Sequence, residues 1–329
     1  MSRICSYLEL RGVADRSGIG AAVRNHVSAL VEQGFEVTSD PRQKYDLLHL
    51  HWPGTSALRF ARRARRAGRP IVLSVHTLPQ LIRGACNFSG GLAWIYLRYM
   101  RWFVRYVDLL IAPSPFAAEL LRPIAGRTPV HVVSSGVDDR RFRFSEEKRS
   151  SFRVRHGLER PTVLSVGCVI PSKGVTTLLD VAGRLPEVDF LWAGPRFHPF
   201  LHFSPRFERA LRRAPENVRF LGFVAGIEEA YCGCDVLFHP SLGESLGLVI
   251  LEAAAVGLRP VVRRLPVYRD WLEDTVDCLM GDDVPSLADA IERLTSEDPP
   301  QLSVKRIVRG HRLHDVGERL SGIYRELLT

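Results

Sequence analysis

Two glutamates, Glu244 and Glu252, lie eight positions apart in a segment that also carries several glycines. Residues 235–239, just before them, form a short apolar run of the kind that makes a buried parallel strand. A helix is expected from about Ser245 to Gly257, where this glycine and a nearby proline act as stop signals. The sequence therefore predicts a strand, a glycine-bearing turn and a helix in direct succession.

This succession favours phosphate binding, because free backbone N–H groups and the positive end of the dipole meet at a helix N-terminus. Gly247, Leu248 and Val249 are the residues expected to hold a diphosphate. Glu252 would lie roughly 8 Å along the helix from its start, and one carboxylate can accept hydrogen bonds from both hydroxyls of a ribose. Glu244 would face the other end of such a ligand. The alternative is a surface helix that carries two unrelated acids.

Three histidines stand at or near the ends of predicted strands in the first half of the chain. Residues 46–51 contain His49 and end in His51, and residues 70–76 end in His76. Ligands bind at the carboxyl ends of strands in a parallel sheet, so all three are candidates for a site. A hydrogen-bonded core histidine is the alternative for each of them.

Two glycine-bearing turns precede predicted helices. Gly18 and Gly20 close a loop in the first half of the chain, where a simple tight turn is the alternative. The turn over 167–174 carries Lys173 directly before its last glycine. A lysine ammonium there could act as a point charge on a phosphate.

Strands and helices alternate along the chain, which predicts the α/β class. A length of 329 residues suffices for two domains that each bury a core, and contents of 46% apolar and 25% charged residues are those of a globular protein. We expect four segments: a first domain over 1–141, a charged linker over 142–160, a second domain over 161–305 and a terminal helix over 306–329.

Several protein classes are disfavoured by what the sequence lacks. No apolar run approaches the length of about eighteen residues that a membrane span needs, and the first residues do not have the form of a signal peptide. A cytoplasmic protein is therefore expected. The six cysteines show no ligand-like quartet, and a cytoplasmic protein would keep them reduced. An Asp-x-Asp pair is also missing, so a metal that clamps a diphosphate is not indicated.

The positive charge is concentrated in the first half of the chain. Residues 1–141 contain 20 Lys and Arg against 10 Asp and Glu, whereas the remainder is nearly balanced. Two predicted helices, over 56–68 and within 87–110, carry arginines, and the second adds aromatic residues suited to a lipid headgroup boundary. An anionic membrane surface or a nucleic acid would fit this charge; solvated helices or snorkelling arginines are the alternatives. The predicted membrane or acceptor surface comprises Arg59, Arg62, Arg63, Arg66, Trp94, Arg98, Arg101, Trp102 and Arg105.

The segment 240–260 resembles the Glu-x7-Glu motif of the retaining glycosyltransferases of family 4, which have the GT-B fold. This resemblance implies two Rossmann-like, doubly wound domains that face a central cleft. The order of Gly18-Ile-Gly20, His76-Thr77, Asn87-Phe-Ser89, the arginine-rich helix and residues 111–114 is similar to the lipid-modifying branch, such as diacylglycerol glucosyltransferases. A C-terminal helix that crosses back to the first domain is also implied.

The resemblance also implies roles for individual residues. His76 and Glu244 would contact the transferred sugar and are the predicted catalytic residues. The family pattern usually has an arginine where this chain has Cys168, so one phosphate cation is missing. The predicted donor-binding residues are Gly18, Gly20, Gly167, Lys173, Val224, Gly247, Leu248, Val249 and Glu252.

The predicted function is retaining transfer of a hexose from a UDP- or GDP-sugar to a lipid or glycan acceptor at the cytoplasmic face of the membrane. No cofactor and no metal are expected. Two alternatives stay open: a non-catalytic subunit that binds a sugar nucleotide, which Cys168 suggests, and a GT-B-type sugar-nucleotide epimerase. Nucleic-acid binding is disfavoured, because it would leave the histidines and the glutamate motif unexplained.

Overall fold

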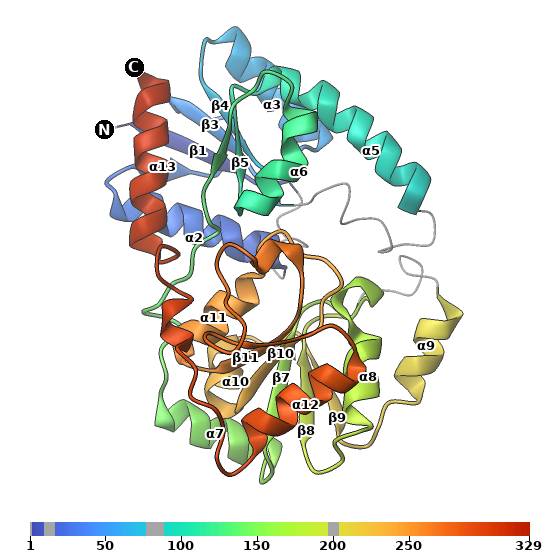
Figure 1. Ribbon diagram of the computed structural model, residues 1–329. Helices are drawn as coiled ribbons and strands as arrows, with labels where there is room; N and C mark the ends of the chain where they lie inside the picture. Colours follow the sequence, from blue (N-terminus) through green and yellow to red (C-terminus); the bar gives the residue numbers. More distant parts are fainter. Residues whose placement is uncertain (1, 10–16, 77–88, 197–203) are drawn as a thin grey trace. The chain divides into compact units, whose positions relative to one another are not determined.

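The computed structural model describes residues 2–9, 17–76, 89–196 and 204–329 (Figure 1). These residues fall into two compact units. The first unit contains residues up to 136 together with the C-terminal residues 310–329. The second unit runs from residue 137 to residue 309.

The first unit is built on a six-stranded parallel sheet with the strand order β2-β1-β3-β4-β5-β6. Its strands are β1 (Arg3–Tyr7), β2 (Glu36–Thr38), β3 (Leu47–Leu50), β4 (Ile71–Ser74), β5 (Leu109–Ala112) and β6 (Val130–Val132). Its helices are α2 (Gly18–Glu32), α3 (Thr55–Arg66), α5 (Ser89–Phe103), η1 (Val104–Tyr106), α6 (Pro115–Ala125) and α13 (Leu313–Leu328).

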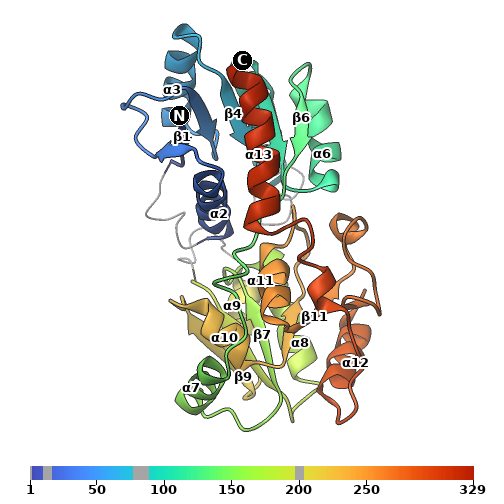
Figure 2. The same cartoon turned by 90° about the vertical axis from the view of Figure 1, so that its left-hand side faces the viewer.

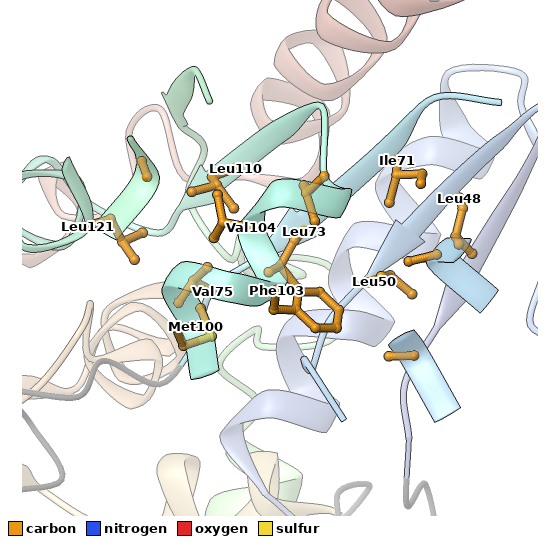
Figure 3. Close-up of a cluster of buried hydrophobic side chains, with 14 of the residues drawn as sticks. Leu48, Leu50, Ile71, Leu73, Val75, Met100, Phe103, Val104, Leu110 and Leu121 are labelled. Carbon is orange, nitrogen blue, oxygen red and sulfur yellow. The ribbon is translucent and has the colours of Figure 1, made fainter. Parts of the chain in front are cut away.

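Successive side chains of a strand point to opposite faces of the sheet. Because consecutive residues of these strands are apolar, both faces of the sheet are apolar. In β3, Leu48 packs with the core on one face and Leu47 packs with the core on the other. Figure 3 shows the first core, where Leu73 and Leu110 from the sheet meet Phe103 at the end of α5. The second core unites the opposite face with residues of α2 and α13.

The C-terminal helix α13 packs on α2 and on the sheet of the first unit, as Figure 2 shows. Its Val316, Leu320 and Tyr324 are fully buried. Gly317 allows the close approach, because a Cβ at this position would lie 2.7 Å from the Ala29 carbonyl oxygen. The terminal segment predicted over 306–329 is thus a helix over 313–328 that belongs to the first unit.

The second unit contains another six-stranded parallel sheet, with the order β12-β11-β10-β7-β8-β9. Its strands are β7 (Thr162–Val166), β8 (Asp189–Ala193), β9 (Val218–Gly222), β10 (Val236–His239), β11 (Arg259–Arg263) and β12 (Leu279–Gly281). Its helices are α7 (Glu146–His156), η2 (Pro171–Lys173), α8 (Val175–Ala182), α9 (Pro205–Arg212), α10 (Ile227–Gly233), α11 (Leu248–Val256), η4 (Pro266–Tyr268), α12 (Val284–Thr295) and η5 (Val304–Arg306).

The predicted linker over 142–160 is wrong, because most of this segment is helix α7 within the second unit. Phe152 is buried, and its ring lies so close to Gly233 of α10 that a Cβ there would be 2.3 Å from it. Arg149 and Arg153 form ion pairs with Asp235, which precedes β10. The charges that suggested a solvated linker therefore hold α7 against its own unit.

None of the helices in the described part of the chain is both long enough and apolar enough to span a membrane.

Candidate active site

The second unit places Lys173 and Glu244 in contact at the carboxyl end of its sheet. Lys173 Nζ lies 2.5 Å from Glu244 Oε1, and His239 Nε2 lies 3.1 Å from the same oxygen. Burial by itself would raise the pKa of the Glu244 carboxyl, but the ammonium of Lys173 and the hydrogen bond from His239 hold it well below its ordinary value. Glu244 is therefore ionised at neutral pH.

Two loops that follow the adjacent strands β7 and β10 bring this pair together. Gly174 has φ +75°, and a Cβ there would lie 2.1 Å from the Pro240 carbonyl oxygen. The backbone N–H of Leu242 donates to the Ser172 carbonyl at 2.9 Å. Only glycine fits at position 174, and this close approach fixes Lys173 beside the loop that carries Glu244.

Helix α11 begins at Leu248, three residues later than the sequence predicts, because Gly247 takes the N-cap position with φ +97°. A Cβ on Gly247 would lie 3.0 Å from Ile250 and 3.3 Å from Tyr268. Gly247 itself has no side chain that could cap this end of the helix. Leu248 and Val249 thus occupy the first turn, where backbone N–H groups have no partner within the helix.

Glu252 lies farther along α11 and is only 8% exposed. Its Oε2 accepts a hydrogen bond of 2.8 Å from the hydroxyl of Tyr231 in α10. Burial and the nearby Glu252 carboxylate raise the pKa of Tyr231 well above its ordinary value, so its hydroxyl stays a donor. The sequence motif alone gives no sign of Tyr231.

The remaining donor-site candidates of the second unit lie in loops. The Gly167 carbonyl after β7 accepts a 2.7 Å hydrogen bond from the indole N–H of Trp192. Burial raises the pKa of the Cys168 thiol although Lys173 acts in the opposite direction, so this residue supplies no charge. Val224 follows β9, which lies at the edge of the sheet, two strands from β7.

Four histidines gather at the carboxyl end of the first unit's sheet. His49 and His51 have ring centroids 4.0 Å apart, and His51 Nδ1 lies 3.3 Å from His76 Nε2. His26 of α2 completes the cluster, with its ring centroid 5.9 Å from those of His49 and His51. The three predicted histidines therefore share one site, and sequence reasoning missed His26.

Three histidines of the cluster, His26, His49 and His76, are neutral at physiological pH. Burial lowers the pKa of His26 to about 4 and, with a contribution from His26, that of His76 to about 3. Burial also holds the pKa of His49 well below its usual value. Neutral imidazoles offer one donor and one acceptor each, which suits them for hydrogen bonding rather than for charge.

Ligand nitrogens of His26, His49 and His51 lie within 4.8 Å of one another, a spacing that could hold a metal ion. Both ring nitrogens of His49 are already hydrogen-bonded, Nε2 to Ser74 at 2.7 Å and Nδ1 to Tyr324 at 2.6 Å. We therefore interpret the cluster as a hydrogen-bonded network.

Gly18 and Gly20 lie in the first turn of α2 rather than in a loop before it. Gly20 is buried, and no atom of the described residues, apart from its chain neighbours and the backbone of its own helix, lies within 4 Å of a Cβ placed on Gly18. His26 follows on the same helix, so α2 links the glycines to the histidine cluster. Thr77 and Asn87, which belong to the family pattern, lie outside the described residues.

The predicted basic surface comes from α3, α5 and η1 of the first unit. The guanidinium of Arg62 lies over the rings of Trp102 and Tyr106, at 5.5 and 5.2 Å from their centroids, and that of Arg98 lies 5.1 Å from the Trp94 centroid. Trp94 is 59% exposed. Within the described residues, no ion pair is formed by Arg59, Arg62, Arg63, Arg66, Arg98, Arg101 or Arg105.

Comparison with known proteins gives the family. Residues 41–141 match the model of Glycosyltransferase Family 4, and residues 160–297 match that of Glycosyl transferases group 1. The processive diacylglycerol alpha-glucosyltransferase of Acholeplasma laidlawii is 28% identical, over 99% of this chain and 98% of that protein. The alpha-galactosylglucosyldiacylglycerol synthase of Streptococcus pneumoniae is 26% identical, over 80% and 73%.

A solved structure gives the same answer for the fold. HepE of Anabaena, solved in complex with UDP and glucose, superposes with a TM-score of 0.79 at 18% identity and covers 99% of this chain and 100% of its own. The prediction of two Rossmann-like domains is confirmed by the two parallel sheets. The chain therefore belongs to the group 1 and family 4 glycosyltransferases and has their GT-B fold.

Proposed function

We propose that this glycosyltransferase moves a hexose from a UDP- or GDP-sugar to a lipid or glycan acceptor. The observation that carries the proposal is the contact of Lys173 with Glu244, in the loop that leads to the glycine-capped start of α11. Together they offer a cation and backbone N–H groups for a diphosphate, and a carboxylate for the hydroxyls of a sugar. The complex of HepE with UDP supports a UDP-sugar as the first donor to test.

Catalysis would rest on electrostatics. As the glycosidic C–O bond breaks, negative charge develops on the departing diphosphate, where the helix N-terminus and Lys173 stabilise it. Glu244 and His76 orient the hydroxyls of the sugar while its anomeric carbon gains positive charge. Attack from the side of the leaving group, with a phosphate oxygen taking the acceptor proton, would retain the anomeric configuration. These groups stabilise the charge without a metal ion.

The acceptor is proposed to be a membrane lipid. The relatives from Acholeplasma laidlawii and Streptococcus pneumoniae are named for diacylglycerol products or acceptors. The basic surface of α3, α5 and η1, with its exposed Trp94, fits the anionic headgroups and the interface at the cytoplasmic face of a membrane. Peripheral association would bring the enzyme to its acceptor.

The test is sugar transfer from a panel of UDP- and GDP-sugars into a lipid extract, measured with and without EDTA. We expect an organic-soluble product whose linkage has the anomeric configuration of the donor, at an undiminished rate in EDTA. Lys173→Ala and Glu252→Gln should lower kcat/KM at least about 100-fold, a loss of roughly 2.7 kcal/mol. Lys305→Ala removes an exposed lysine of the same unit and should be silent.

Other outcomes would redirect the assignment. Donor binding without transfer to any acceptor would indicate a non-catalytic sugar-nucleotide-binding protein. Transfer only to a water-soluble acceptor would overturn the lipid assignment and keep the donor site. Equal activity of Lys173→Ala and Lys305→Ala would overturn the proposed phosphate site.

A further inference from the structure

Three consecutive strands of the first unit's sheet end in a chain of polar side chains. Ser6 lies in β1, His51 follows β3 and His76 follows β4. Ser6 Oγ lies 3.0 Å from His51 Nε2, and His51 Nδ1 lies 3.3 Å from His76 Nε2. His51 therefore bridges a buried hydroxyl and the histidine that we place at the transferred sugar.

The direction of these hydrogen bonds follows from the surroundings of Ser6. This side chain is 1% exposed, and within the described residues its hydroxyl has one hydrogen-bond partner, Nε2 of His51. A buried hydroxyl that donated to nothing would be unfavourable, so the Ser6 O–H donates to Nε2. A neutral imidazole has one donor and one acceptor. The proton of His51 is therefore on Nδ1, and it is donated to Nε2 of His76.

We propose that His51, oriented by Ser6, is a positioning residue that holds His76 in the tautomer protonated on Nδ1. In this tautomer Nδ1 of His76 can donate a hydrogen bond to a sugar oxygen and cannot act as a base. The role at the sugar rests on the proposed function; the tautomer itself does not.

The low pKa of His76, about 3, supports the need for such a device. Because the ring is neutral at neutral pH, its two nitrogens differ, and the tautomer decides which of them can donate. His51 settles that choice before the substrate binds, which avoids a reorganisation during the reaction.

The tautomer can be tested on the full chain by NMR, with 15N-labelled histidine and correlations between ring protons and ring nitrogens. Signals are assigned by their loss in His76→Gln and His51→Gln. We expect both His51 and His76 to be protonated on Nδ1. Ser6→Ala removes the donor to His51 and should move both rings toward mixed tautomers.

A matched control is available at the end of β4, the strand that precedes His76. Ser74→Ala removes another buried hydroxyl, 2.7 Å from Nε2 of His49, which is outside the Ser6–His51–His76 chain. This variant should leave the ring signals of His76 unchanged. A wild-type His76 protonated on Nε2 would overturn the proposal, and so would an equal response to Ser6→Ala and Ser74→Ala.

Kinetics separates this inference from the proposed function. Ser6→Ala should lower kcat about tenfold, the effect of one hydrogen bond that acts in the transition state, without raising KM for the nucleotide sugar. Ser6→Thr keeps the hydroxyl and should restore kcat. An active enzyme whose kcat is insensitive to Ser6→Ala would refute the positioning role. A wild type that transfers no sugar would refute the proposed function, while the NMR result on the tautomer still stands.

Discussion

At the scale of the residue, the orientation of Glu252 depends on a partner in another helix. The Tyr231 hydroxyl donates to Glu252 Oε2 at 2.8 Å, and both side chains are buried. A buried carboxylate that loses a donor keeps its desolvation cost. Tyr231 therefore stabilises the fold and fixes the carboxylate that we expect to bind the ribose.

Tyr231→Phe should lower the free energy of unfolding by about 1–3 kcal/mol, since it leaves a buried acceptor without this donor. It should also raise the dissociation constant of the nucleotide, as Glu252 loses its fixed orientation. Urea unfolding and calorimetric titration with UDP or GDP measure the two effects. Tyr268→Phe is the matched control, because the buried Tyr268 hydroxyl has no hydrogen-bond partner within the described residues. Equal losses in both variants would contradict the role given to Tyr231.

The motifs that contain Glu244, Glu252 and Lys173 could be recognised in the sequence because they are local. Glu244 and Lys173 lie in glycine-bearing turns, and Glu252 lies in the helix that follows the turn of Glu244. The partners of these residues could not be predicted from the sequence. Tyr231 is a single tyrosine in another short helix, and its contact with Glu252 depends on how α10 meets α11. His26 likewise joins the other histidines only once α2 covers the sheet.

At the scale of the element, the contact of α13 with α2 depends on one small residue. Gly317→Ala should reduce stability by about 1–3 kcal/mol, because the added methyl would lie 2.7 Å from the Ala29 carbonyl oxygen. Gly322→Ala in the same helix has open space and should be neutral or stabilising, by up to about 1 kcal/mol, through helix propensity. Thermal unfolding of the two variants measures the difference. If Gly322→Ala were destabilised as well, the loss of stability would come from substitution in α13 itself and not from the contact with Ala29.

The basic surface of α3 is predicted to bind anionic membranes. Replacing Arg59, Arg63 and Arg66 by alanine should weaken binding to phosphatidylglycerol vesicles roughly 100-fold, since each basic residue near such a surface contributes about 1 kcal/mol. Vesicle sedimentation at low and high salt measures this, and salt should weaken the wild type as well. The control variant replaces Arg206, Arg209 and Arg212, three exposed arginines of α9 in the second unit, by alanine. If both variants lost binding equally, net charge rather than this surface would be responsible.

The misassigned segment 142–160 shows why element boundaries are hard to predict from composition. Its charges indicate a linker only if they are solvated, but Arg149 and Arg153 pair with Asp235, more than eighty positions later in the sequence. One buried side chain, Phe152, anchors the helix. A single buried apolar position, with the helix's other apolar residue Val154 exposed, does not create a helical periodicity that sequence reasoning can detect.

At the scale of the whole molecule, the two parallel sheets could be predicted because their strands are short apolar runs that alternate with helices. In β3 and β4, every residue is buried, as expected for strands covered on both faces. The division into units could be placed only approximately, since the second unit starts at residue 137 and the last residues rejoin the first unit. That return depends on the packing of α13 against α2, which involves residues about 300 positions apart.

The concentration of buried histidines in the first unit predicts that the two units respond differently to acid. The folded-state pKa of His26 is about 4 and that of His76 about 3, both below the unfolded value of 6.5. Between these values the unfolded chain binds more protons, so the histidines' contribution is complete above pH 6.5 and is lost as the pH falls toward 4. At pH 5 His26 and His76 should each cost about 2 kcal/mol of stability relative to pH 7.

Hydrogen exchange at pH 7 and pH 5, corrected for the intrinsic exchange rates, separates the units peptide by peptide. Peptides of β3, β4 and α2 should lose protection at pH 5 before those of β7 and β10. The lowered pKa of His156 in the second unit belongs to a partly exposed side chain, so solvent screens part of its effect. His26→Gln should flatten the pH dependence of the first unit, whereas His314→Gln, at an exposed position, should not change it. Earlier loss of protection in the second unit would show that buried histidines do not set the acid limit of this fold.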